Sequence, residues 1–373
     1  MMCARMTDFN KTKIMFVLPA LTAGGAERVM ITLMNGLDRD RYAPCLVSVS
    51  DKGDLHDLID QDIDFCTLKQ KHLALGWAGL FQHLRREKPD VVISTMAHMN
   101  FVLLTMRPFF PKTKFIVREA ITPSFLFNKY KKTSWLIKLM YQILYPAADA
   151  VLSPSQIIFD EFRDVLRMSS KNFFVLNNPV NTKTIRACYE ALSKKDAAHH
   201  KSVHFLAVGR LGRQKGFDRL IEYLPRLSLP YDWTLTILGE GDEREHLESL
   251  IRKHGFEDKV FMPGLVRPPW QHYLQADCFL MPSRYEGLPN VVLESLACGV
   301  PVIATRESGG IAYIRDHSPK GAVRVVDSMH EFVQAMEQVK PGKASHKKSL
   351  LNDMFEQKAV FRHFVKILHM VQR

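Results

Sequence analysis

Short apolar stretches alternate with helical patterns along most of the chain, and this rhythm constrains the fold more than any other feature. The first half predicts helices at Val29–Leu37, Leu55–Ile59 and near Phe101. The strands predicted around these helices are Ile14–Leu18, Ala43–Val49, Val91–Ser94, Phe115–Val117 and Ala150–Leu152. Strands that alternate with helices indicate a parallel sheet with crossover helices.

The same rhythm restarts in the second half. It predicts helices at Phe217–Leu227 and Asp242–His254. The strands predicted there are Val203–Val208, Thr234–Leu238, Val260–Met262, Cys278–Met281 and Val300–Ala304. A chain of 373 residues is long enough for two domains. We therefore expect an α/β protein of two doubly wound, Rossmann-like domains facing a central cleft, where ligands bind at the carboxyl ends of the strands.

The connection between the halves contains Asn177–Asn181 and then a polar stretch, Ser193–Ser202, where we place the hinge. We expect a first domain over residues 1–180 and a second over residues 181–355. Residues 356–373 are expected to form a C-terminal helix that packs back toward the first domain.

Cysteine spacing and hydropathy bound the class of protein. The six cysteines include no Cys-x-x-Cys pair, which argues against a structural zinc site or a disulfide framework. No apolar run reaches about 18 residues, and Met1–Lys13 does not resemble a signal peptide. We expect a protein in the cytoplasm.

The net charge of +12 indicates an anionic partner. The stretch from Arg107 to Lys138 contains many basic residues but one acidic residue, Glu119, and the basic residues are interleaved with aromatic and aliphatic ones. The basic residues are Arg107, Lys112, Lys114, Arg118, Lys129, Lys131, Lys132 and Lys138. This mixture is typical of a helix in a membrane interface, here an anionic one. The alternative is an amphipathic helix whose apolar face meets the core; a nucleic-acid partner is disfavoured because no binding motif is present.

Two glutamates eight residues apart surround an expected helix start. Cys278–Met281 predicts a buried strand, Glu286 lies in the following loop, and Asn290 can cap a helix that carries Glu294 one turn inside it. The free N–H groups of the helix start favour an anion such as a phosphate beside the carboxylates. Such a site suits a ligand with phosphate and sugar hydroxyls. The alternative is a solvated loop residue and an ordinary helix-start charge.

In each half, one glycine-containing loop follows the first strand. Gly24 and Gly25 allow the backbone to approach a ligand closely. The alternative is a simple glycine turn without a role in binding. In the second half, the loop Gly209–Gly216 carries Arg210 and Lys215, two cations that can neutralise a diphosphate.

Together these motifs resemble the retaining family 4 glycosyltransferases, which have the GT-B fold. The resemblance rests on Gly24-Gly25-Ala-Glu27, Gly209-Arg210 to Lys215-Gly216, Gly239-Glu-Gly241-Asp242 and Glu286-Gly-Leu-Pro-Asn-Val-Val-Leu-Glu294. It implies transfer of a sugar from a nucleotide-diphosphate donor, usually a UDP-sugar. The expected acceptor is a lipid-linked glycan in surface polysaccharide or lipopolysaccharide synthesis, at the inner face of the cell membrane.

The resemblance also implies roles for individual residues. Arg210 and Lys215 bind the diphosphate, and Glu294 holds the ribose hydroxyls. Glu286 and the backbone of Leu288, Pro289, Asn290 and Val291 contact the donor sugar, and the loop around Val266 cradles the base. Gly24 and Gly25 approach the phosphates and the acceptor. The implied mechanism is front-face displacement, in which the leaving diphosphate accepts the proton of the acceptor hydroxyl.

The first domain departs from the family pattern. Many members carry a histidine after the strand that corresponds to Phe115–Val117, where this chain has Arg118 and Glu119. Some relatives acting on lipid-linked oligosaccharides share this pair, so these two residues are candidates. His98 is a third candidate, although a histidine at a strand end is often structural.

No metal site or cofactor is expected. Asp60-Gln-Asp62 superficially matches the metal motif of another glycosyltransferase fold, but it ends a predicted helix and is interpreted as surface charge. Two rival functions remain open on the same fold: a sugar-nucleotide epimerase or hydrolase, and an inactive membrane-bound partner subunit.

Overall fold

The computed structural model describes residues 11–22, 24–53, 55–70, 73–169, 171–193, 201–342 and 348–373. The chain divides into two compact units. Unit 1 comprises Met1–Pro179 and Val360–Arg373, and unit 2 comprises Val180–Ala359. Most of the polar stretch in which the hinge is predicted, residues 194–200, lies outside the described residues, as does most of Met1–Lys13.

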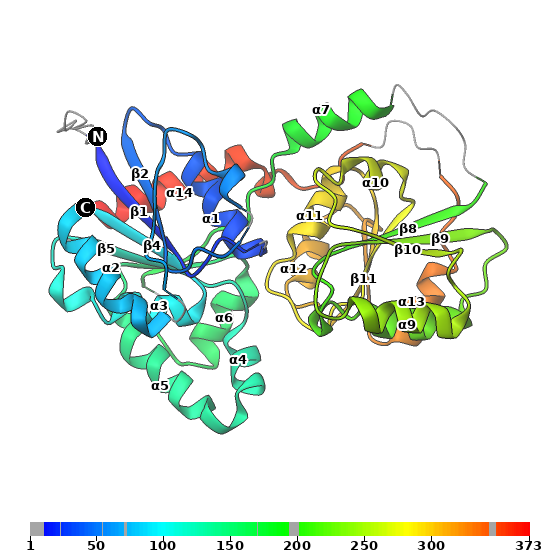
Figure 1. Ribbon diagram of the computed structural model, residues 1–373, viewed down its shortest axis with the longest axis horizontal. Helices are drawn as coiled ribbons and strands as arrows, with labels where there is room; N and C mark the ends of the chain where they lie inside the picture. Colours follow the sequence, from blue (N-terminus) through cyan, green and yellow to red (C-terminus); the bar gives the residue numbers. More distant parts are fainter. Residues whose placement is uncertain are drawn as a thin grey trace. The chain divides into compact units, whose positions relative to one another are not determined.

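The described part of unit 1 contains a seven-stranded parallel sheet in the order β3-β2-β1-β4-β5-β6-β7 (Figure 1). Its strands are β1 (Thr12–Leu18), β2 (Tyr42–Ser48), β3 (Asp64–Thr67), β4 (Val91–Thr95), β5 (Lys114–Arg118), β6 (Ala150–Ser153) and β7 (Phe173–Val175). The order reverses between β1 and β4, which is the kind of position where open α/β sheets bind their ligands.

Apolar clusters cover both faces of this sheet. Odd and even positions of β1 point to opposite faces, with Ile14 and Phe16 in one cluster and Met15 and Val17 in the other. The helices of the unit are α1 (Gly25–Asn35), α2 (Leu73–Glu87), α3 (Ala97–Leu104), α4 (Pro123–Lys129), α5 (Ser134–Leu144), α6 (Gln156–Asp164) and α14 (Gln357–Gln372). None of the helices that the structure describes is long and apolar enough to cross a membrane.

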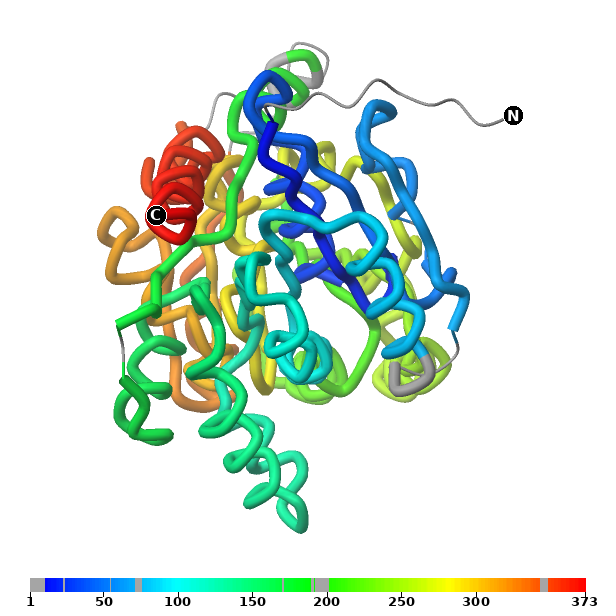
Figure 2. The backbone as a smooth tube through the Cα atoms, turned by 90° about the vertical axis from the view of Figure 1, so that its left-hand side faces the viewer, coloured from blue at the N-terminus to red at the C-terminus, as the bar shows by residue number. Residues whose placement is uncertain are grey.

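Helix α14 completes the core of unit 1 from the far end of the sequence. Phe364, Ile367 and Leu368 are buried in the same cluster as residues of α1 and β1. Figure 2 shows α14, in red, ending against this unit. Just before α14, Glu356 forms a parallel bridge with Val180, so the outgoing and returning segments of the chain lie side by side.

Unit 2 contains, within its described residues, a six-stranded parallel sheet in the order β10-β9-β8-β11-β12-β13. The strands are β8 (Val203–Val208), β9 (Trp233–Leu238), β10 (Val260–Gly264), β11 (Cys278–Met281), β12 (Val302–Thr305) and β13 (Val323–Val326). The helices are α7 (Thr182–Ser193), α8 (Phe217–Tyr223), α9 (Arg244–His254), α10 (Trp270–Gln275), α11 (Asn290–Ala297), α12 (Ile311–Asp316) and α13 (Met329–Met336). The predicted pair of parallel α/β domains is confirmed.

Some local predictions are wrong. The helix predicted over Phe217–Leu227 ends at Tyr223, and a 3-10 turn that contains Pro225 follows, because proline disrupts a continuing helix. The pattern at Leu55–Ile59 yields only a 3-10 turn, His56–Leu58. The short strands β3, β7 and β13 were not predicted; β7 has three residues, too few for a period-2 pattern to stand out.

The packing of α14 predicts a large effect of Phe364→Ala on unit 1. The side chain is 1% exposed, so its truncation should leave a cavity and lower the free energy of unfolding by about 3–5 kcal/mol. Met370→Ala is the matched control on the same helix, since Met370 is 52% exposed. Denaturation with urea measures both. An equal decrease in the free energy of unfolding for the two variants would contradict the assignment of α14 to this core.

Candidate functional site

The sheet of unit 2 changes direction between β8 and β11. These strands are neighbours although two others lie between them in sequence. The loop after β8 leads to α8 and on to β9, whereas the loop after β11 leads to α11 and on to β12 on the other side. Ligands of open α/β sheets bind at such a position, outside the carboxyl ends of the strands.

Two predicted site residues meet there. Lys215 Nζ, from the β8 loop, lies 2.7 Å from Glu286 Oε1, from the β11 loop. Ser283 Oγ donates a second hydrogen bond of 3.0 Å to the same carboxylate oxygen. The side chains of Lys215 and Glu286 are 18% and 10% exposed, so the pair is shielded from most of the solvent yet reachable.

Several polar contacts fix the two loops against each other. Both guanidinium Nη atoms of Arg284 pair with the carboxylate of Asp218 at 2.7 Å each. Burial tends to raise the pKa of Asp218, but the paired Arg284 outweighs it and holds this pKa below its usual value. Arg219 donates to the carbonyl oxygens of Pro282 and Ser283, both at 2.8 Å. Such bidentate charged contacts give a defined geometry.

Glycines bring neighbouring loops into close contact. A Cβ on Gly239, which has φ +145°, would lie 1.9 Å from the carbonyl oxygen of Gly209. A Cβ on Gly309, with φ +57°, would lie 1.9 Å from the carbonyl oxygen of Glu286. Gly310 N–H donates to the Gly287 carbonyl at 2.7 Å. The backbone that carries Glu286 is therefore packed directly against the segment after β12.

Helix α11 follows this loop. Asn290 is its first residue and Pro289 occupies the N-cap, with no side-chain cap hydrogen bond, so the prediction that Asn290 caps the helix is wrong. The proline supplies an extended backbone that leads directly into the first turn. Glu294 lies one turn inside the helix, as predicted, and is 9% exposed. Leu288 is buried and Val291 is partly exposed.

Two further predicted residues flank the site from separate loops. Arg210 follows Gly209 directly and is exposed; it forms no ion pair within the described part of the chain. Val266 follows β10 and is partly exposed, packed against the apolar cluster that contains α11. The roles of Arg210 in binding the diphosphate and of Val266 in contacting the base stay predictions.

In unit 1, α1 begins at Gly25, with Gly24 at its N-cap. A Cβ on Gly24 would lie 2.1 Å from Glu27 Oε2, and Thr22 Oγ1 donates to Glu27 Oε1 at 2.8 Å. Glu27 is 5% exposed. A carboxylate of the chain itself therefore lies at the helix start, the kind of position that favours an anion.

Arg118 closes β5 and is 2% exposed. Its Nη2 donates to Asn178 Oδ1 at 2.5 Å and its Nη1 to Thr95 Oγ1 at 3.4 Å, whereas Nε has no partner among the described residues. Burial lowers its pKa to about 10. The side chain therefore links the ends of β4 and β5 to the segment that leaves unit 1.

Glu119 is fully buried in a polar cluster. It accepts hydrogen bonds from Tyr145 Oη, from Asn100 Nδ2 at 3.2 Å and from Tyr141 Oη at 3.5 Å. Burial raises the pKa of Glu119 to about 8, against the opposing effects of Asn100, Arg118 and Tyr141. With no exposed surface, Glu119 is suited to positioning its neighbours rather than to touching a ligand.

His98 lies in the first turn of α3, just after β4, and its ring is exposed. The neighbouring protein partly desolvates the ring and so lowers its pKa. Met96, the N-cap of α3, has φ +71°, an uncommon conformation for a methionine. Because an unusual backbone conformation adjoins an exposed histidine at the β1/β4 reversal, His98 stays a candidate.

Other polar clusters serve the fold. Asp60 and Asp62 pair with Arg39 at 3.2 and 2.8 Å, in the turn before β3. No group of three or more potential metal ligands occurs in the described parts of the chain.

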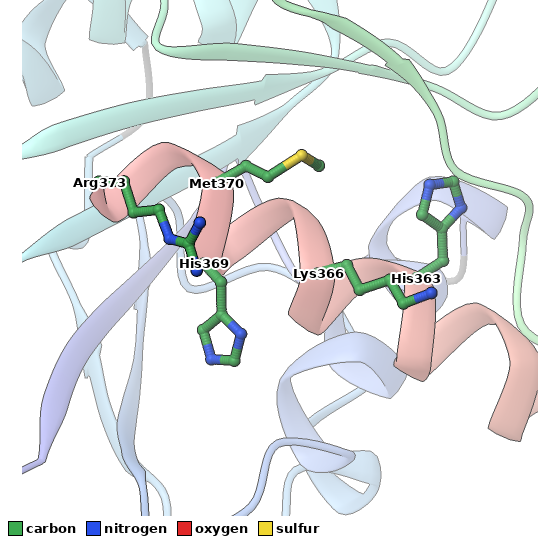
Figure 3. Close-up of a pocket in the computed structure, with 5 residues that line it drawn as sticks. All are labelled: His363, Lys366, His369, Met370 and Arg373. Atoms are coloured by element: carbon green, nitrogen blue, oxygen red, sulfur yellow. The ribbon is translucent and has the colours of Figure 1, made fainter.

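A surface pocket of about 450 Å³ lies on α14 and is lined by His363, Lys366, His369, Met370 and Arg373 (Figure 3). There Arg41 Nη2 and Tyr42 Oη contact His369 Nε2, which holds α14 on β2.

Ser283, Arg219, Asp218 and Gly309 were not assigned a role from the sequence. Ser283 lies inside the motif that carries Glu286, so its position three residues before the glutamate was the available signal. The other three act through contacts between distant segments, for which the sequence holds no local signal.

The raised pKa of Glu119 predicts a pH dependence of stability. The folded state retains this proton more strongly than the unfolded state, so its contribution is fully present below the ordinary value of 4.5 and is lost as the pH rises through about 8. Glu119→Gln should therefore gain in stability relative to wild type between pH 5 and pH 8, by at most about 1.4 kcal/mol per pH unit.

Thermal unfolding across this pH range measures the difference, with Glu257→Gln as a control at an exposed position. A constant difference between Glu119→Gln and wild type at every pH would show that the carboxyl group does not titrate in this way.

Two family models match consecutive parts of the chain. "Glycosyltransferase Family 4" matches residues 23–184, and "Glycosyl transferases group 1" matches residues 189–351. Among curated proteins, an N-acetylgalactosamine-N,N'-diacetylbacillosaminyl-diphospho-undecaprenol 4-alpha-N-acetylgalactosaminyltransferase of Campylobacter jejuni is 28% identical, over 87% of this chain and 89% of its own length. The lipopolysaccharide core biosynthesis glycosyltransferase LpsE of Rhizobium meliloti is 25% identical over 85% of each chain.

Solved structures share the fold. The lipopolysaccharide outer core galactosyltransferase WaaB, in its apo form, matches with a TM-score of 0.71 and 23% identity, covering 96% of this chain and 99% of its own. HepE of Anabaena in complex with UDP-glucose matches with a TM-score of 0.75 and 18% identity, covering 96% and 99%. The two Rossmann-like sheets, the paired motifs and both family models lead to one conclusion: this chain belongs to the group 1, or family 4, glycosyltransferases and has the GT-B fold.

Proposed function

We propose that the protein transfers a sugar from a nucleotide-diphosphate donor, preferably a UDP-sugar, to a lipid-linked glycan. The product keeps the anomeric configuration of the donor, and the reaction needs no bound metal ion. The acceptor belongs to surface polysaccharide or lipopolysaccharide synthesis, and the enzyme works in the cytoplasm at the inner face of the cell membrane.

One observation carries this proposal: Lys215 and Glu286 lie 2.7 Å apart across the β8/β11 reversal. A cation for phosphate and a carboxylate for sugar hydroxyls are the two groups that a sugar nucleotide requires at the junction of its two halves. Arg210, exposed in the same loop as Lys215, adds a second cation.

The rest of the donor is assigned to the neighbouring loops. Glu294 accepts hydrogen bonds from the ribose hydroxyls, and the loop around Val266 contacts the base. The backbone from Leu288 to Val291 contacts the sugar at the start of α11. The N–H groups of that helix start favour the negative charge that grows on the leaving diphosphate.

Bond formation follows a front-face displacement. The acceptor hydroxyl attacks the anomeric carbon while the bond to the diphosphate breaks, and its proton passes to the departing phosphate oxygen. The charge of Arg210 and Lys215 stabilises that leaving group. Electrostatic stabilisation of this kind is usually the largest single contribution of an enzyme to catalysis.

Unit 1 receives the acceptor in this proposal. Gly24 and Gly25 allow close approach of the backbone at the β1/β4 reversal, and His98 is exposed at the same strand ends. Arg118 and Glu119 are buried and act as positioning residues for these loops. The names of curated relatives support this class of acceptor, since the Campylobacter jejuni enzyme acts on a diphospho-undecaprenol glycan and LpsE is named for lipopolysaccharide core biosynthesis.

Product analysis with labelled donors tests the function. The protein is incubated with radiolabelled UDP-sugars in excess chelator, with and without an undecaprenyl-linked glycan. Transfer of label to the lipid, with NMR showing the donor's anomeric configuration, is expected. An altered or hydrolysed sugar nucleotide without acceptor would favour an epimerase or hydrolase instead, and no reaction with any donor would favour an inactive partner subunit.

Glu294→Gln should weaken binding of free UDP by about tenfold. A carboxylate that accepts two hydroxyl protons becomes an amide with less acceptor capacity, and hydrogen bonds to charged groups contribute about 1.5–3 kcal/mol. Titration calorimetry measures the change, and Glu243→Gln, at the start of α9, is the control. An unchanged UDP affinity would remove Glu294 from the proposed nucleotide site.

The α4–α5 segment supports a membrane-bound enzyme. Helix α5 uses one face for the core, where Tyr141 is fully buried, and leaves the other apolar face uncovered. The exposed apolar residues of this face are Trp135, Leu136, Leu139 and Ile143, which are 66%, 42%, 41% and 63% exposed. One face of α5 therefore packs against the core, and the exposed apolar face supports the proposal of a membrane interface. The segment, teal in Figure 2, extends away from the rest of unit 1.

The charges of this segment suit an anionic lipid surface. Lys129, Lys131, Lys132 and Lys138 are exposed, and the sequence from Pro123 to Leu144 contains no acidic residue. Other basic residues of the wider stretch serve the fold, since Arg107 and Lys114 pair with Asp149 and Arg118 is buried. An apolar stripe flanked by lysines is the pattern of an interfacial helix.

Reversing Lys129, Lys131 and Lys132 to glutamate should release the protein from anionic vesicles, by about a hundredfold or more in partition coefficient, because each basic residue near such a surface contributes about 1 kcal/mol. The control reverses Lys253, Lys320 and Lys340, three exposed lysines of unit 2, with the same change of net charge. Vesicle flotation measures both. Equal release by the two triple variants would show that only net charge matters.

A further inference from the structure

The cation that the proposed function assigns to the diphosphate already has a partner. Lys215 Nζ is paired with Glu286 Oε1 at 2.7 Å, and both side chains are largely shielded from water. A diphosphate that binds Lys215 must therefore compete with Glu286. A partly buried carboxylate that loses its cation needs replacement donors, because an uncompensated charge of this kind is costly.

The carboxylate is held more firmly than the lysine. Gly309 and Gly310 pack against the backbone at Glu286 and Gly287, and Ser283 Oγ holds Oε1 at 3.0 Å. Ser283 is itself fixed, since its carbonyl accepts from Thr305 Oγ1 at 2.8 Å, from Arg219 and from Ser308. Lys215, in contrast, has a long, flexible side chain that lies across Gly209. The lysine is the partner that can turn away.

We propose that Lys215, Glu286 and Ser283 form a latch that distinguishes the intact sugar nucleotide from the free nucleotide. The diphosphate draws Lys215 away from Glu286, and the hydroxyls of the attached sugar then donate to the released carboxylate. Free UDP offers no such hydroxyls, so Glu286 competes for Lys215 again. The latch thereby favours binding of the donor and departure of the nucleotide product.

Ser283 is a positioning residue in this latch. Its hydroxyl stays bonded to Glu286 Oε1 while Lys215 binds the phosphate, so the carboxylate keeps its orientation toward the sugar. The inference rests on the proposed function for the identity of the ligand, and on the described contacts for the competition.

The test measures binding of UDP and of UDP-glucose, UDP-galactose and their N-acetylated counterparts by titration calorimetry. Glu286→Gln should bind UDP about three- to tenfold more tightly than wild type, because the competing charge is gone, and should lose its preference for a sugar nucleotide over UDP. Ser283→Ala keeps the ion pair, so its UDP affinity should stay within about twofold of wild type. Its preference for the sugar nucleotide and its kcat should fall.

Ser308→Ala is the matched control. It removes a buried hydroxyl whose 3.2 Å hydrogen bond to the Ser283 carbonyl is longer than those from Thr305 and Arg219, both 2.8 Å, so these two still hold Ser283 in the variant. It should keep the wild-type preference for the sugar nucleotide. A Ser308→Ala variant that loses this preference as Ser283→Ala does would show a general loss of loop structure and overturn the role of Ser283.

Lys215→Ala separates the latch from the proposed function. If this variant loses UDP affinity while Glu286→Gln gains it, both stand. If Lys215→Ala loses UDP affinity but Glu286→Gln binds UDP as wild type or more weakly, the nucleotide site is right and the latch is wrong. If Lys215→Ala binds UDP as wild type does, the donor site proposed here is itself wrong, and the latch fails with it.

Discussion

The pairing of β8 with β11 is the constraint on which the site in unit 2 depends. It places side by side two loops, residues 209–216 and 282–289, that are far apart in the sequence. Ligands of open α/β sheets bind where two such neighbouring loops continue in opposite directions. Arg284 with Asp218, and Arg219 with the carbonyls of Pro282 and Ser283, fix the two loops against each other. Lys215 and Glu286 meet only because this frame holds.

Unit 1 uses the same topology but treats its charged groups differently. At the ends of β4 and β5, Arg118 and Glu119 are buried; Arg118 donates to Asn178, and Glu119 accepts from Asn100 and Tyr145. A charge in such surroundings is costly unless it is well bonded, so these residues specify how the loops are arranged. The charges of unit 2 are shielded but reachable. In the proposed function, the buried groups of unit 1 fix the arrangement of its loops, and the cations of unit 2 neutralise the ligand.

The sequence predicted the two sheets, and it singled out Lys215, Glu286 and Glu294 as candidate site residues, because both kinds of feature leave local signals. Apolar strands alternate with helices, and Lys215, Glu286 and Glu294 lie in compact motifs beside glycines. It did not predict which groups hold these residues, since Arg219 and Gly309 act across long sequence separations. Nor could it predict that Glu119 is fully buried, because that burial is produced by Tyr145 and Asn100 from other elements. The start of α11 was missed by one position because Pro289, with its extended backbone, occupies the N-cap position that was expected for Asn290.

The return of the chain to unit 1 through α14 has an evolutionary consequence. Unit 2 is an insertion within unit 1, bounded by the junctions at Pro179–Val180 and Ala359–Val360. A chimaera that exchanges unit 2 between two such proteins must therefore be spliced at both junctions. A single crossover would combine the sheet of one parent with the α14 of the other, and the interdigitated core around Phe364 and Leu368 would be mismatched. Recombination at the paired junctions can replace unit 2 while leaving unit 1, with its own terminal helix, intact.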